Sequence, residues 1–86
     1  MAATEFDFAD VKEKAEKTLR AVFPTDTIDV SESYKGRAHV LIVSAKFNGM
    51  SERQKQDFIW DVLRAEMESD AEAITSVVCY GTEELM

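Results

Sequence analysis

The sequence predicts an α+β domain of two layers, with the element order αββαβ and a three-stranded mixed sheet. Two segments repeat apolar residues at steps of three and four, as amphipathic helices do, and three others alternate or are rich in β-branched residues, as strands are. The third strand follows the second helix, so a crossover allows it to pair in parallel with the second strand. Because a chain of 86 residues is the size of one domain, we expect residues 1–86 to form a single domain with both helices on one sheet face.

The first helix is predicted by one apolar stripe that precedes a proline. Asp7 or Asp10 is suited to cap its N-terminus. Pro24 should end it, because a proline displaces the residue before it from the helical region. The stripe consists of Phe8, Val11, Ala15, Leu19 and Val22.

The first two strands are predicted to form a hairpin. Residues 27–33 alternate, with Ile28 and Val30 on one side, which is typical of a half-buried strand. The turn at residues 34–37 contains Gly36, which is free to take a positive φ. Since the connection is short, the two strands should pair in antiparallel fashion.

The second strand is predicted to be central in the sheet. Residues 38–46 are almost all apolar, which is typical of a strand covered on much of both faces, and we expect Leu41 and Val43 in the core. Residues 74–80 are rich in β-branched side chains and predict the third strand, after a polar link at residues 68–73.

The second helix should span residues 51–67. Ser51 and Gln54 have the spacing of a capping box, in which each side chain binds a backbone amide of the other residue. Trp60 is expected at the edge of the buried face, and residues 81–86 should add a tail with one helical turn. The buried face should contain Phe58, Ile59, Val62 and Leu63.

Composition excludes several classes of protein. A net charge of −7 argues against broad binding of nucleic acids or anionic membranes, which require a basic surface. No apolar run approaches the ~20 residues of a membrane span, and residues 1–10 lack the basic start of a signal peptide. Cys79 is the single cysteine, so no intrachain disulfide can form, and we expect a cytoplasmic protein.

Positive charge is nevertheless concentrated in the middle of the chain. Residues 35–55 contain five basic residues and one acid, Glu52, whereas residues 57–86 contain eight acids and one base. This basic segment is either a set of solvated charges or a patch for an anion or a partner. Its basic residues are Lys35, Arg37, Lys46, Arg53 and Lys55.

No pattern predicts catalysis. His39 lies alone within the second strand and Cys79 within the third, so each is either a packing residue or a weak candidate for a metal ligand. The carboxylates are spread along helix faces, and no glycine-rich phosphate motif is present.

The turn before the second helix has two interpretations. Asn48, Gly49 and Ser51 precede a helix N-terminus, where free amides and the helix dipole favour an anion, and Arg53 and Lys55 stand in its first turns. Alternatively, Gly49 turns the chain, Ser51 caps the helix, and nothing binds.

Several short motifs follow one another in a specific order along residues 11–84. A helix that ends at Phe23-Pro24 is followed by the strand over residues 28–30, by a strand that closes on Val43-Ser44, and by a Glu83-Glu84 ending. The most specific motif is Phe47-x-Gly49-x-Ser51, which is followed by a helix with Trp60 at an aromatic position. In this order and spacing, the sequence resembles the BolA-like family.

This resemblance implies the αββαβ fold of a class II KH-like domain and a non-enzymatic role. Many BolA-like proteins are adaptors that pair with monothiol glutaredoxins, share a [2Fe-2S] cluster with them, and serve iron homeostasis or stress responses. Others resemble DNA-binding transcriptional regulators.

The sequence departs from the family at the positions of the cluster ligands. Where the family has an Arg-His pair early in the second helix, this sequence has Lys55-Gln56. The family's histidine ligand before the third strand is replaced by Ala73, and its Cys or His ligand in the hairpin loop is replaced by Arg37. Alanine and arginine do not donate an electron pair to iron. Either the chain has lost the cluster, or His39 or Cys79 compensates for a different register.

Two hypotheses of function remain, an adaptor for a protein partner and a KH-like nucleic-acid module that uses the basic segment. The KH motif GxxG is absent, since Gly49 is followed by Met50, Ser51 and Glu52, so we favour the adaptor. We expect a monomer or weak homodimer that alone binds no cofactor. Its working surface should combine the hairpin turn at Lys35 and Arg37 with the turn from Asn48 to Lys55.

Overall fold

The computed structural model describes residues 6–85. The start of the segment considered as a signal peptide and Met86, the end of the expected tail, lie outside this range. The two helices are α1 (Phe8–Val22) and α2 (Glu52–Met67), and the three strands are β1 (Thr27–Glu32), β2 (Ala38–Val43) and β3 (Ile74–Tyr80). Short 3-10 turns are η1 (Ala45–Phe47), η2 (Glu68–Ala73) and η3 (Thr82–Leu85).

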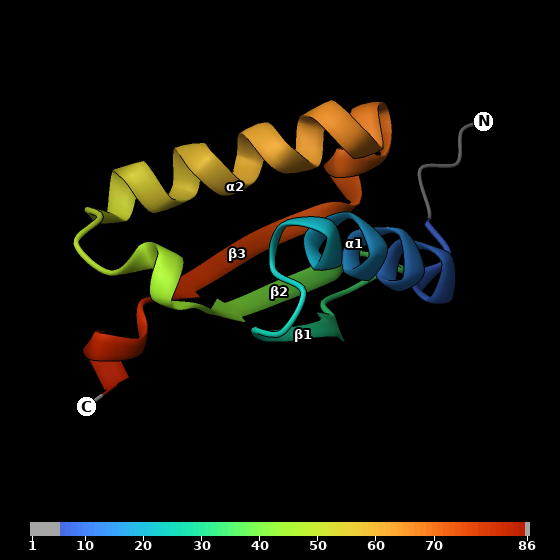
Figure 1. Cartoon of the computed structure of the whole chain (residues 1–86). Coiled ribbons are helices and arrows are strands. Elements are labelled where there is room, and N and C mark those ends of the chain that lie inside the picture. Colours follow the sequence, from blue (N-terminus) through green and yellow to red (C-terminus); the bar gives the residue numbers. More distant parts are fainter. Residues whose placement is uncertain (1–5, 86) are drawn as a thin grey trace.

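The sheet has the predicted mixed topology. Its strand order is β1-β2-β3, with β1 antiparallel to β2 and β3 parallel to β2. Val30 lies opposite Val40, and Ile42 lies opposite Cys79. Both helices cover the same face of the sheet, α1 over β1 and α2 over β3 (Figure 1). The predicted two-layer αββαβ fold is therefore confirmed.

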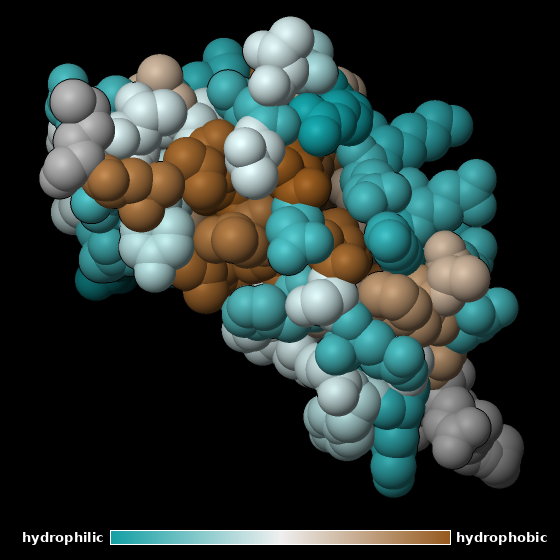
Figure 2. Space-filling view, turned by 90° about the horizontal axis from the view of Figure 1, so that it is seen from below, coloured by the Kyte–Doolittle hydropathy of each residue, from teal (hydrophilic) through white to brown (hydrophobic). Residues whose placement is uncertain are grey.

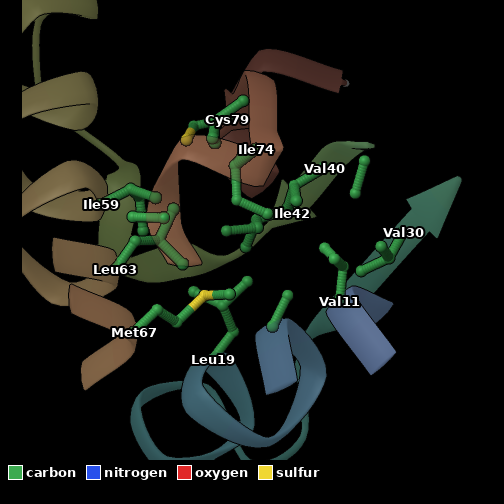
Figure 3. Packing of buried hydrophobic residues seen from close by; sticks show 14 of the residues in the cluster. Val11, Leu19, Val30, Val40, Ile42, Ile59, Leu63, Met67, Ile74 and Cys79 are labelled. Atoms are coloured by element: carbon green, nitrogen blue, oxygen red, sulfur yellow. The ribbon is translucent and has the colours of Figure 1, made fainter. Parts of the chain in front are cut away.

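The core lies between the helices and the sheet (Figure 3). Leu63, predicted to be buried, is fully enclosed, together with Ile59 from the same helix. Phe58 and Val62 are only half-buried, because they flank this stripe on α2. Phe58 still packs edge-on against Phe23, with their ring centroids 6.1 Å apart.

The predicted core face of β2 was wrong. Val40 and Ile42 are buried, whereas Leu41 and Val43 are half-buried on the opposite face. The reason is that both helices lie on one side, so only alternate residues of the strand meet them. The strand also ends at Val43 rather than Lys46, because the chain turns into η1.

Local signals at the helix ends behaved as predicted. The Asp7 side chain accepts a hydrogen bond from the amide of Ala9 and caps α1, and Phe23 ends that helix before the proline. The capping box of Ser51 and Gln54 is complete. None of the helices in residues 6–85 is long and apolar enough to cross a membrane.

Candidate partner-binding site at the ends of the sheet

The two segments expected to form one working surface lie at opposite ends of β2. The hairpin turn precedes Ala38 and the other turn follows Val43, and Figure 1 shows these two ends of the strand at opposite ends of the sheet. Six residues of extended chain separate them by roughly 20 Å. The expectation of a combined surface was therefore wrong, and each end must be considered alone.

Lys55 is buried, contrary to its expected place on an exposed patch. Its side chain is 1% exposed, and its ammonium group lies 2.7 Å from Glu84 Oε1 and 2.9 Å from Glu52 Oε2. The same group donates to the backbone carbonyl of Cys79 at 3.2 Å. The hydrogen bonds to Glu84 and Glu52 raise the pKa of Lys55, and those from Lys55 and the Gly81 amide lower the pKa of Glu84. Lys55 thus has no free capacity for an external anion.

The turn before α2 holds the C-terminal segment of the chain. The side-chain amide of Asn48 donates to Thr82 Oγ1 at 3.0 Å, and its oxygen accepts from the amide of Glu83 at 3.1 Å. A Cβ on Gly81 would overlap the Asn48 side chain, so this contact requires glycine. Asn48 and Lys55 together fasten η3 to the start of α2. The turn is a structural junction.

Gly49 and Arg53 complete the description of this turn. Gly49 has a φ of +84°, and a Cβ added there would meet no atom within 4 Å. Glycine is therefore favoured here by the positive φ and not by a lack of space. Arg53 is 91% exposed, and its nearest acidic group is Asp57 at 3.9 Å. Of the basic residues predicted here in the helix, Arg53 alone is available at the surface.

Two side chains of α2 cover the outer edge of β3. Gln56 donates to the carbonyl of Val77 at 2.8 Å, and Lys55 donates to that of Cys79. The Tyr80 carbonyl points instead towards β2, where it accepts from Ser44. Since alternate carbonyls of a strand point in opposite directions, Val77 and Cys79 present theirs at the free edge. These contacts oppose the addition of another strand there.

The hairpin end presents an arginine between two aromatic rings. The guanidinium carbon of Arg37 lies 5.1 Å from the ring centroid of Tyr34 and 5.3 Å from that of Phe6. The amide of Phe6 also donates to the carbonyl of Lys35. A Cβ on Gly36 would overlap the backbone of Phe6, and the φ of +80° at Gly36 also favours glycine. The N-terminal segment therefore lies against the turn and supports it.

Tyr34 and Lys35 are both exposed at this end. Tyr34 is 57% exposed, and Lys35 lies beside it with a φ of +51°. Ile74, the start of β3, pairs with Ala38 at the same end. We call Tyr34, Lys35 and Arg37 the hairpin surface.

The two weak candidates for metal ligands point to opposite sides of the sheet. Cys79 is buried among the core residues, whereas His39 lies on the other face, where its ring nitrogen Nδ1 bonds with the hydroxyl of Ser76. Burial raises the pKa of the Cys79 thiol to about 11. Within residues 6–85, no three histidine, cysteine or acidic side chains are grouped so that they could hold a metal ion. His39 and Cys79 therefore do not form one site, and Ala73 is itself buried.

The face of the sheet away from the helices is partly apolar. Tyr80 is 39% exposed there. Figure 2 shows hydrophobic residues grouped on the side of the molecule opposite α2, with hydrophilic residues around them. By the strand register, this uncovered face contains Thr27, Asp29, Ser31, His39, Leu41, Val43, Ser76, Val78 and Tyr80.

Comparison with known proteins supports the fold. No protein-family model and no curated protein matches the sequence. Among solved structures, the chain is similar to the NMR structure of a BolA-like hypothetical protein from Rickettsia prowazekii, with a TM-score of 0.56 and 21% identity. The match covers 80% of this chain and 88% of that one. The fold is BolA-like.

Two contributors to these sites were not predicted. Tyr34 stands beside Lys35 in the hairpin turn. Because this turn is polar, the sequence could have predicted that the aromatic side chain is exposed. Glu84 gave no such signal, because its partner Lys55 lies 29 residues away.

Proposed function

We propose that this protein is a non-enzymatic adaptor that binds a partner protein through the hairpin surface. The observation that carries the proposal is the exposed ring of Tyr34 with the Arg37 guanidinium packed over it. Tyrosine and arginine are enriched among the residues that dominate binding at protein interfaces. Here the stack holds both side chains in place before binding, which lowers the entropy lost on association.

The proposed partner is a monothiol glutaredoxin, the class implied by the resemblance to BolA-like proteins. This pairing would place the adaptor in iron homeostasis or a stress response. Arg37 and buried Ala73 occupy the positions of the family's cluster ligands, and neither side chain donates an electron pair to iron. We therefore propose a complex in which any [2Fe-2S] cluster draws its ligands from other molecules.

The nucleic-acid alternative loses its main support. The basic segment does not form one patch, because Lys35 and Arg37 lie at the hairpin end while Arg53 lies at the other, and Lys55 is buried. Phosphate binding depends on several exposed cations acting together. With a net charge of −7, these separated cations favour a protein partner over a nucleic acid.

Isothermal titration of the full chain with a purified monothiol glutaredoxin tests the proposal. We expect wild type to bind, and Tyr34→Ala and Arg37→Ala each to weaken binding by about tenfold or more, as hot-spot truncations do. Arg53→Ala is the matched control at the other end of the sheet and should bind like wild type. Thermal unfolding of each variant checks that the fold is kept.

Three results would count against the proposal. They are no binding heat for wild type, a loss of affinity in Arg53→Ala as large as in Arg37→Ala, and normal binding by the hairpin variants. An absorbance spectrum of the complex tests separately whether the complex contains an iron–sulfur cluster. Iron–sulfur bands that disappear in His39→Ala would show that this chain supplies a ligand.

A further inference from the structure

The two helices leave a groove between them on the side away from the sheet. It has a volume of about 940 Å³ and is formed by a second stripe on each helix. On α1 this stripe contains Lys14, Lys17, Thr18 and Ala21, and on α2 it contains Phe58, Asp61, Val62 and Ala65. Both sets have the spacing i, i+3, i+4, i+7, which is one continuous face of a helix.

The floor of the groove is apolar. Phe58, Val62 and Val22 are half-buried, so part of each side chain contacts solvent there. Ala21 and Ala65 are exposed on the two walls, and their small side chains allow a third helix to approach closely. The groove therefore has the shape and chemistry of a seat for an amphipathic helix.

The rim of the groove is charged unequally. Asp61, Glu66 and Glu68 line the α2 side, and within residues 6–85 neither glutamate has an ion-pair partner. Asp61 lies 3.9 Å from Arg64, but both side chains are largely exposed, so this pair contributes little. Lys17 is the one cation of the rim without an ion pair in the described part of the chain.

The remaining cation of the rim is already neutralised. Lys14 bonds to Asp70 at 2.8 Å and lies 3.3 Å from Asp10, and these contacts raise the pKa of Lys14. This ion pair also joins α1 to η2 at one end of the groove. The balance of free charge is thus three carboxylates on the α2 rim against one ammonium on the α1 rim.

We propose that this groove binds an amphipathic helix of a partner protein, with basic residues along the flank that faces α2. The lining runs from Lys14 to Val22 on α1 and from Phe58 to Met67 on α2, about two and a half turns of each helix, so the bound helix would need about 10–14 residues. Apolar anchors would contact Phe58 and Val62, and lysine or arginine side chains would pair with Asp61 and Glu66. The chain's net charge of −7 would further draw a basic segment towards it.

A second copy of this chain is a poorer occupant. Two molecules of charge −7 repel each other, and both helices already use their main apolar stripes in the core, where α1 buries Leu19 and α2 buries Leu63. No other amphipathic helix is present in residues 6–85 to enter the groove of a neighbour.

Binding of designed peptides to the full chain tests the proposal by fluorescence anisotropy. One peptide of about 14 residues carries leucines on one face and lysines on a flank, and a matched peptide replaces the lysines with glutamates. Both carry the same hydrocarbon staple, because short helices are marginal in water. We expect wild type to prefer the basic peptide by about tenfold or more, with an affinity that falls as salt rises.

Charge-reversed variants locate the site. Asp61→Lys with Glu66→Lys should reverse the preference between the two peptides, whereas Glu13→Lys with Glu72→Lys makes the same change of charge outside the groove and should preserve it. Ala65→Arg should abolish binding of the basic peptide by filling the groove with a cation. Tyr34→Ala should bind the peptide like wild type, so failure of the proposed function would not affect this test.

Several outcomes would overturn the inference. They are equal affinity of wild type for both peptides, no binding of the basic peptide, and equal effects of the two charge-reversed pairs, which would indicate only general electrostatic attraction. A homodimer in light scattering that Ala65→Arg dissociates would identify a second copy as the occupant instead.

Discussion

Lys55 joins three parts of the molecule through one ammonium group. It holds the start of α2 through Glu52, the end of β3 through the Cys79 carbonyl, and the C-terminal turn through Glu84. Its own side chain is 1% exposed, whereas Glu84 and Glu52 are 40% and 75% exposed, so removal of the acids would leave the ammonium group in the interior without its counter-charges. Lys55 is therefore a stabilising residue rather than a contact for a partner.

We predict that Lys55→Met clearly lowers the free energy of unfolding in urea. The methionine keeps most of the side-chain volume, but it removes the donor of the Cys79 carbonyl and the charged donor of Glu84, which keeps only its bond from the Gly81 amide. The control Arg53→Met, at an exposed position two residues earlier, should change stability by no more than about 0.5 kcal/mol. A double-mutant cycle with Glu84→Met measures the coupling, and additive losses would show that the pair does not act as a unit.

Residues whose partners are near in sequence were predictable, and those with distant partners were not. The capping box depends on a spacing of three residues, so Ser51 and Gln54 could be assigned directly. The burial of Lys55 depends on Cys79 and Glu84, which lie 24 and 29 residues further along. No local pattern distinguishes such a lysine from an exposed one like Lys35.

At the scale of elements, the period of a segment decided how well its faces could be predicted. The stripe of α2 was located to within one position, since Ile59 and Leu63 form its centre while Phe58 and Val62 flank it. The apolar run of β2 has no period of two, so its sequence did not indicate which face meets the helices. The buried face of β2 is determined by the packing of both helices on one side of the sheet.

We predict that Leu63→Ala costs roughly 2–5 kcal/mol of unfolding free energy, as truncation of a fully buried leucine does. Val62→Ala is the control on the same helix, and it should cost less, because part of this side chain already faces solvent in the groove. Chemical denaturation of both variants provides the measurement. Similar losses for the two would mean that α2 is rotated relative to the sheet.

On the scale of the whole molecule, the sheet separates two ends with different roles. At one end, Asn48 and Lys55 fasten the last turn of the chain to the start of α2. At the other, Phe6 of the N-terminal segment and a hydrogen bond from Thr75 to Ser33 support the hairpin turn, and Tyr34 is exposed. The parallel crossover from β2 through α2 to β3 carries the chain from the first of these ends to the second and back (Figure 1). The end at Asn48 and Lys55 thus stabilises the fold, whereas the hairpin end is available for binding.

The contribution of Glu84 to the stability of the fold should depend on pH in a defined direction. The hydrogen bonds from Lys55 and Gly81 lower the pKa of Glu84 in the folded state, so its contribution to stability is present above the ordinary glutamate value of about 4.5. That contribution is lost as pH falls through the lower pKa of the folded state. The pKa of Lys55 is raised, so its contribution is present below about 10.5 and is lost as pH rises through its higher folded value.

We therefore predict that Glu84→Gln is less stable than wild type at neutral pH and that the difference shrinks towards pH 3. At low pH the wild-type carboxyl is also uncharged, so both proteins lack the pair with Lys55. Urea denaturation at about pH 7, 5 and 3 measures the difference. Glu83→Gln is the matched control, since within residues 6–85 the Glu83 carboxylate makes no ion pair and only its backbone amide bonds to Asn48. A difference for Glu84→Gln that stays constant with pH would show that charge does not hold η3 in place.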